Sequence, residues 1–261
     1  GLPMCAGRAE LLALSAIHGL VAWPNDILLS EALLEALWHL GRGDQKLPRR
    51  VLQSLEDTRL YFAYARGMWL HGDRGGARAI LLRLCAASAP AAPDARLAVA
   101  WWHLEFCESG GEARWGTWGG MPPRAFRVLV GLALGKFDQE MIGDSPLGLE
   151  SALQSLQAIA RLQSALPGQN SKDAGGFRLL LSSYHAHLVA LCALVARTHP
   201  ERSFQLFLRE LPRGGAGVVG CDGGQAGAGG GSAAARAVAE EERCWALCSG
   251  IMVEILRAAP S

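Results

Sequence analysis

The sequence predicts an all-α fold, and three observations support this prediction. Apolar residues recur at spacings of three and four along most of the chain, as they do in helices with one buried face. Turns rich in glycine and proline separate these stretches, and no run shows the alternating, β-branched pattern of a strand. Half of the 261 residues are apolar and 19% are charged, which is typical of a globular chain.

The first helix is predicted over residues 7–23. Its periodic face carries residues at spacings of three and four, namely Leu11, Leu14, Ile17, His18 and Val21. The sequence Pro-Asn-Asp at 24–26 ends this helix and can cap the next one, over 27–40, which stops at Gly41. Further helices are predicted over 49–71, 76–88, 94–108, 123–135, 146–165, 176–198, 201–211 and 234–258.

A glycine-rich segment interrupts the helical pattern near the C-terminus. Residues 213–232 contain ten glycines in twenty positions, and ordering so many glycines costs too much backbone entropy for a packed element. Because a strongly helical stretch follows, we expect a flexible insert within one helical domain that covers residues 1–261. The opening "GLPMCAGRAE" has neither an initiator methionine nor a signal-peptide pattern, so we expect the chain to be a fragment of a longer protein.

The composition favours some function classes over others. Lys and Arg (25) nearly balance Asp and Glu (24), so net charge gives no support for direct RNA binding. No apolar run reaches the roughly 18–20 residues of a membrane-spanning helix. The seven cysteines form no CxxC pair and lie mostly in apolar helical stretches, which predicts buried free thiols in an intracellular reducing compartment.

A repeat-like pattern covers residues 49–111. The predicted helix over 49–71 carries an aromatic-rich stripe that includes Trp69, the turn Gly72-Asp73 follows, and "ARAILLRL" (77–84) begins the next helix. The stretch "WWHLEFCESGG" (101–111) again places aromatic residues and an acid before a Gly-Gly turn, and a looser copy spans 179–211. A single such helical pair cannot bury its apolar face alone, so neighbouring pairs must stack.

This pattern resembles the half-a-TPR (HAT) repeat of RNA-processing proteins, and most closely the nuclear-RNAi-defective-two family. The resemblance implies antiparallel helical hairpins stacked as an irregular TPR/HAT-like α-solenoid. It also implies a nuclear scaffold without catalytic activity, which binds proteins such as the exosome's RNA helicase or splicing factors. The delay of the next helix until about residue 123 departs from the repeat pattern.

Several short motifs suggest chemistry that their context does not support. Residues 215–220 read GxGxxG, but the motif follows a helix and lies among further glycines, whereas a dinucleotide site follows a strand. The stretch "GDRGGAR" (72–78) lacks the GK[ST] ending of a phosphate loop, which favours a turn between helices. His185 and His187 point to different sides of a helix, and Cys244 and Cys248 have no second ligand pair nearby in sequence. The sequence therefore predicts no catalytic, cofactor or metal site.

The candidate partner-binding residues are two loop tryptophans and three arginines. Trp115 and Trp118 lie between glycines in "RWGTWGG", where large aromatic side chains can anchor a partner protein or stack on RNA bases. The arginines are Arg74, Arg78 and Arg114. Two other functions stay open. An organellar RNA-binding repeat protein would carry a basic stripe along each repeat, and a helical domain with a small-molecule pocket would carry a polar cluster inside the bundle.

Overall fold

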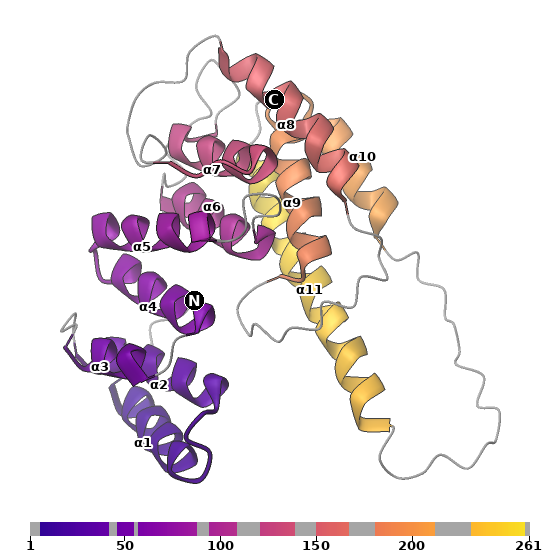
Figure 1. Ribbon diagram of the computed structural model, residues 1–261. Coiled ribbons are helices and arrows are strands. Elements are labelled where there is room, and N and C mark those ends of the chain that lie inside the picture. Colours follow the sequence, from indigo (N-terminus) through magenta and orange to yellow (C-terminus); the bar gives the residue numbers. More distant parts are fainter. Residues whose placement is uncertain are drawn as a thin grey trace, which may run out of the picture. The chain divides into compact units, whose positions relative to one another are not determined.

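The computed structural model describes residues 6–41, 46–54, 57–87, 94–108, 121–138, 150–166, 181–211 and 231–258 (Figure 1). Within these ranges every regular element is a helix, which confirms the predicted all-α fold. The contacts divide the chain into two compact units. Unit 1 comprises Gly1–Pro93 and Phe137–Gly143, and unit 2 comprises Asp94–Lys136 and Asp144–Ser261.

Unit 1 contains five helices that pack mainly against their neighbours along the chain. They are α1 (Ala6–Ala22), α2 (Ile27–Leu40), α3 (Lys46–Ser54), α4 (Thr58–Leu70) and α5 (Arg74–Ala87). Helix α2 packs against α1, α3 and α4, and α4 packs against α5. The Asp26 carboxylate accepts the Leu29 backbone N–H at 3.0 Å, so the predicted cap does begin α2.

The prediction of one helix over 49–71 is wrong, because the structure has two helices in this range. Helix α3 ends at Ser54, and Asp57 caps α4 by accepting the Arg59 backbone N–H at 2.7 Å. An aspartate carboxylate competes for backbone N–H groups and so favours a helix start over a helix interior. The apolar period continues on both sides of Asp57, and periodicity alone therefore does not reveal the break.

The stretch "GDRGGAR" contains the predicted turn between α4 and α5, which Gly72 and Asp73 form, and its remaining residues begin α5 at Arg74. Gly72 has a positive φ of 93°, a conformation that glycine adopts without steric cost. The Asp73 carboxylate accepts the Gly76 backbone N–H at 3.0 Å, within the first turn of α5. The glycines of this stretch thus serve chain reversal and helix initiation.

Unit 2 is arranged around one central helix. Its helices are α6 (Ala95–Glu108), α7 (Pro123–Leu134), α8 (Glu150–Ala165), α9 (Ser183–Ala196), α10 (Pro200–Glu210) and α11 (Gly231–Ala258). Helix α9 packs against all five others, and α11 runs beside it although a long stretch of chain separates them (Figure 1). The helix predicted from residue 176 begins at Ser183, where Ser182 accepts the His185 backbone N–H as the cap.

The predicted glycine-rich insert lies mostly outside the described residues. Its last two residues, Gly231 and Ser232, belong to α11, which begins three residues before the predicted start. The expected single domain over 1–261 stays a prediction.

Candidate functional site

The predicted partner-binding residues have different positions. Arg114, Trp115 and Trp118 lie outside the described residues. Arg74 is exposed at the first residue of α5. Arg78 is buried, and its guanidinium carbon lies 4.9 Å from the ring centre of Trp69. The structure therefore gives Arg78 a packing role between α4 and α5, while its expected contact with a partner stays a prediction.

An exposed row of large apolar side chains runs along α1. The exposed fractions are 67% for Leu11, 63% for Leu14, 48% for Ile17 and 81% for Val21. Residues at these spacings lie on one side of a helix, and we call this row the α1 apolar face. Trp23, in the turn after α1, and Leu28, in the first turn of α2, are also exposed. Contiguous exposed apolar residues of this size are typical of interaction surfaces.

The other side of α1 holds the contact with α2, and it is built from small residues. Ala13 and Ala16 are buried in a cluster with Ala32, Leu33 and Ala36 of α2. Alanines let two helix backbones approach closely, and the partly buried Leu12 and Leu20 of α1 pack against the same cluster. A helix that is apolar on both sides is normally covered on both sides. Within the described part of unit 1, α1 is covered on one.

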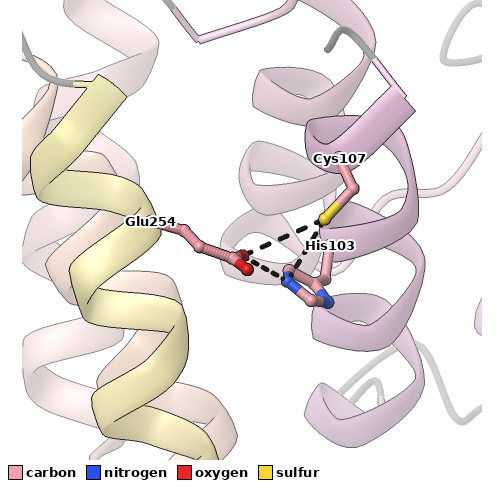
Figure 2. A group of neighbouring side chains, drawn as sticks. All are labelled: His103, Cys107 and Glu254. Atoms are coloured by element: carbon pink, nitrogen blue, oxygen red, sulfur yellow. Dashed lines mark hydrogen bonds and ion pairs between the residues drawn. The ribbon is translucent and has the colours of Figure 1, made fainter. Parts of the chain in front are cut away.

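A second candidate site lies in unit 2, where His103, Cys107 and Glu254 point toward one another (Figure 2). His103 Nε2 lies 2.9 Å from Glu254 Oε2 and 3.4 Å from Cys107 Sγ. Cys107 Sγ lies 4.0 Å from Glu254 Oε2. Imidazole, thiol and carboxylate are all groups that bind transition metals, so this cluster is a candidate metal site.

Two helices of unit 2 supply this cluster. His103 and Cys107 are four residues apart on α6, a spacing that places both on one face, and Glu254 comes from the last part of α11. The His103 ring packs beside Trp102, whose indole is fully buried. Partial burial and the nearby Glu254 carboxylate raise the pKa of the Cys107 thiol to about 11. The side chains of His103 and Glu254 are partly exposed, so the cluster is open to solvent.

Sequence reasoning missed this cluster. The His-x3-Cys spacing on a predicted helix was a usable signal, because it puts two metal-binding groups on one face. The third group follows 147 residues after Cys107, and nothing local relates the two positions. The His185 ring centre lies 4.6 Å from that of Trp245, and His187 Nδ1 lies 2.8 Å from the Ser183 carbonyl oxygen of the same helix. Cys244 and Cys248 are buried.

A pocket of about 630 Å³ lies between α8, α9 and α10 of unit 2. Its walls combine apolar side chains such as Ile159 and Leu206 with the cationic side chains of Arg197 and Arg202. Arg197 is buried, and its guanidinium carbon lies 4.1 Å from the ring centre of Phe126. An apolar pocket with a few polar groups is the usual form of a small-molecule site.

Comparison of the chain with protein-family models, curated proteins and solved structures finds no match. The likeness to HAT-repeat proteins therefore stays a prediction from the residues that carry it. Among the described helices, none has the length and apolar composition needed to cross a bilayer. The described cysteines form no disulfide: Cys107 is exposed, and the buried ones are Cys85, Cys192, Cys244 and Cys248.

Proposed function

We propose that this protein is a non-catalytic helical-repeat scaffold that binds a partner protein through the α1 apolar face. The observation that carries this proposal is the double-sided apolar character of α1. Its alanine side is used inside unit 1, and its side of large residues is exposed. Covering that side removes apolar surface from water, which drives protein association.

The sequential packing in unit 1 supports a scaffold made of stacked helical hairpins. Helix α2 packs against α1 and α4, and α4 packs against α5, so each helix contacts its neighbours along the chain. Repeat proteins of this kind bury a continuous core between neighbouring hairpins. We propose that an apolar partner surface, such as one side of an amphipathic helix, covers the α1 apolar face.

The resemblance to HAT repeats supports a more specific role in nuclear RNA processing and RNA surveillance. On that basis the partner would be the exosome's RNA helicase or a splicing factor, and the protein would act in the nucleus. The pattern of "ARAILLRL" after an aromatic helix and a turn supports this role, since 77–84 falls within α5, directly after α4 and the turn at Gly72.

The test is affinity purification from nuclear extract with the purified chain as bait, followed by mass spectrometry. A Leu14→Glu/Val21→Glu variant places two charges on the α1 apolar face, where both side chains are exposed, so the fold should survive. We expect the unaltered chain to enrich exosome-helicase or splicing proteins and the variant to lose them. A Leu70→Glu/Leu153→Glu variant, which alters two equally exposed leucines elsewhere, is the matched control and should retain the enrichment.

The outcomes separate the parts of this proposal. Enrichment that survives in the Leu14→Glu/Val21→Glu variant keeps the scaffold but moves its contact surface away from α1. In that case a Trp115→Ala/Trp118→Ala variant tests the predicted loop tryptophans. If the unaltered chain enriches no nuclear RNA-processing protein, the nuclear role is wrong. Enrichment of RNA that falls steeply with salt would instead favour an organellar RNA-binding protein.

The pocket between α8, α9 and α10 favours a second function, the binding of a small amphipathic anion. Its apolar walls suit a hydrocarbon or aromatic body, and Arg197 and Arg202 suit a carboxylate or phosphate group. Thermal-shift screening against fatty acids and aromatic carboxylates tests this alternative. A stabilising ligand whose effect is lost in Arg202→Gln would support it, because Arg202 is exposed at the pocket and its replacement should not disturb the core.

A further inference from the structure

The geometry points to a divalent-metal site formed by His103, Cys107 and Glu254, with Zn²⁺ as the preferred ion. The three ligand atoms all lie within 4.8 Å of one another, and they come from two helices of unit 2 (Figure 2). This inference is independent of the scaffold proposal, because the α1 apolar face contributes no residue to the cluster.

The separations between the ligand atoms suit tetrahedral coordination after small side-chain movements. Zinc–sulfur bonds of about 2.3 Å and zinc–nitrogen or zinc–oxygen bonds of about 2.0–2.2 Å place tetrahedral ligands roughly 3.3–3.6 Å apart. The Sγ–Nε2 separation is already 3.4 Å. The Nε2–Oε2 separation of 2.9 Å must widen, and the Sγ–Oε2 separation of 4.0 Å must shorten. Both changes amount to about half an ångström, which the long, partly exposed Glu254 side chain can provide.

The kinds of ligand select the metal. Thiolate and imidazole favour Zn²⁺ and related transition metals, whereas Mg²⁺ and Ca²⁺ require oxygen ligands. The His103–Glu254 contact joins α6 to α11, and the four-residue spacing on α6 brings the Cys107 sulfur to 3.4 Å from His103 and 4.0 Å from Glu254. Three protein ligands leave the fourth position of a tetrahedral ion to water, and the exposure of the cluster gives the ion a path in.

A bound ion would join two helices that are distant in sequence. Helix α9 packs against both α6 and α11, and the cluster would connect α6 to α11 directly. A ligand that binds the folded state and not the unfolded one stabilises the fold by mass action. Zinc binding should therefore raise the melting temperature of the chain, and this effect should depend on all three side chains.

The experiment uses the full chain under reducing conditions, freed of metal with a chelator and titrated with Zn²⁺ in a calorimeter. We expect binding of one ion per chain at this cluster and an increase in melting temperature. A parallel titration with Co²⁺ reports the ligands directly, because a cobalt–thiolate bond gives a charge-transfer absorption in the near ultraviolet. Replacing Cys107 with serine should abolish that absorption.

Single variants test each ligand against matched controls. Cys107→Ser, His103→Gln and Glu254→Gln should each weaken Zn²⁺ binding at least about tenfold, because loss even of a residue that only supports a ligand costs that much. His18→Gln on α1 and Glu242→Gln on α11 replace exposed residues of the same types and should leave the affinity unchanged. Circular dichroism checks that the variants keep their helical content.

Two results would overturn the inference. The first is a chain that binds no Zn²⁺ in the calorimeter. The second is binding, or a cobalt–thiolate absorption, that persists unchanged in Cys107→Ser, since that would place the ion on other cysteines. Neither result bears on the scaffold proposal, whose test depends on Leu14 and Val21.

Discussion

Helices α1 and α9 have similar apolar sequences but different surroundings. Both carry apolar residues on more than one side. In α9, eleven of the fourteen residues are buried, because α6, α7, α8, α10 and α11 pack around it. In α1, the buried apolar residues with the lowest exposure are Ala9, Ala13 and Ala16, while Leu11, Leu14, Ile17 and Val21 are exposed.

This difference shows how the same local pattern can serve two purposes. An apolar helix that the chain covers completely stabilises the fold of its own unit. An apolar helix that the chain covers on one side has surface left for another molecule. The composition of α1 therefore does not distinguish core from interface, and the distinction comes from what packs against it.

The comparison predicts a large difference between two leucine truncations. Leu188 of α9 is fully buried, so Leu188→Ala should reduce the free energy of unfolding by about 2–5 kcal/mol through lost burial and a residual cavity. Leu14→Ala in α1 should change it by at most about 0.5 kcal/mol, because the side chain is already exposed. Chemical denaturation followed by circular dichroism measures both. Equal losses in the two variants would mean that the α1 apolar face is covered in solution.

The burial of α9 also predicts that the stability of the chain depends on pH through His185. Burial lowers the pKa of His185 to about 4 from its ordinary value of 6.5. The unfolded chain binds this proton more tightly, so stability is fully present above about pH 6.5 and falls as the pH decreases toward 4. The loss attributable to this residue is at most about 3 kcal/mol.

Unfolding experiments between pH 4 and 7 measure this dependence. His185→Gln should reduce the slope of stability against pH in that window, whatever its effect on stability at pH 7. An unchanged slope in His185→Gln would show that other groups cause the acid sensitivity.

Inside unit 1, α4 offers a position where helix packing is close, because Gly67 is one of its buried residues. The Trp38 indole lies directly on the α4 backbone at Gly67, and a β-carbon at that position would overlap the ring. Gly67→Ala should therefore reduce the free energy of unfolding by about 1–3 kcal/mol, because the buried indole must shift. Thermal and chemical denaturation measure the change. A stabilised Gly67→Ala variant would contradict the close approach of Trp38 to α4.

The parts of the fold that the sequence could predict are those set by neighbouring residues. Asp26 caps α2, and the turn at Gly72 separates α4 from α5, because both depend on residues within one helical turn. The break between α3 and α4 is also set locally, because Asp57 caps α4. Periodicity did not predict this break, because the apolar spacing continues on both sides of Asp57. A capping residue inside a periodic stretch was the signal that could have revealed it.

The parts that the sequence could not predict depend on distant packing. Periodicity identified Leu11, Leu14, Ile17 and Val21 as one face of a helix, but it could not show which side of α1 meets α2. Arg78 is buried against Trp69 because α4 and α5 pack together, so its packing role could not be predicted from neighbouring residues alone. Likewise, His103 and Cys107 are neighbours on one helix, whereas Glu254 reaches them only through the packing of unit 2.

Gly250 of α11 is the counterpart to Gly67, because replacing it with alanine should stabilise the fold slightly. Gly250 lies inside α11, and a β-carbon added there would meet no atom within 4 Å. Gly250→Ala should therefore raise the free energy of unfolding by about 0.5–1 kcal/mol, because alanine loses less backbone entropy than glycine in a helix. The same denaturation experiment measures this increase. Opposite signs at Gly67 and Gly250 would show that the space around a glycine, rather than helix propensity, decides its role, and a loss at both positions would contradict the open surroundings of Gly250.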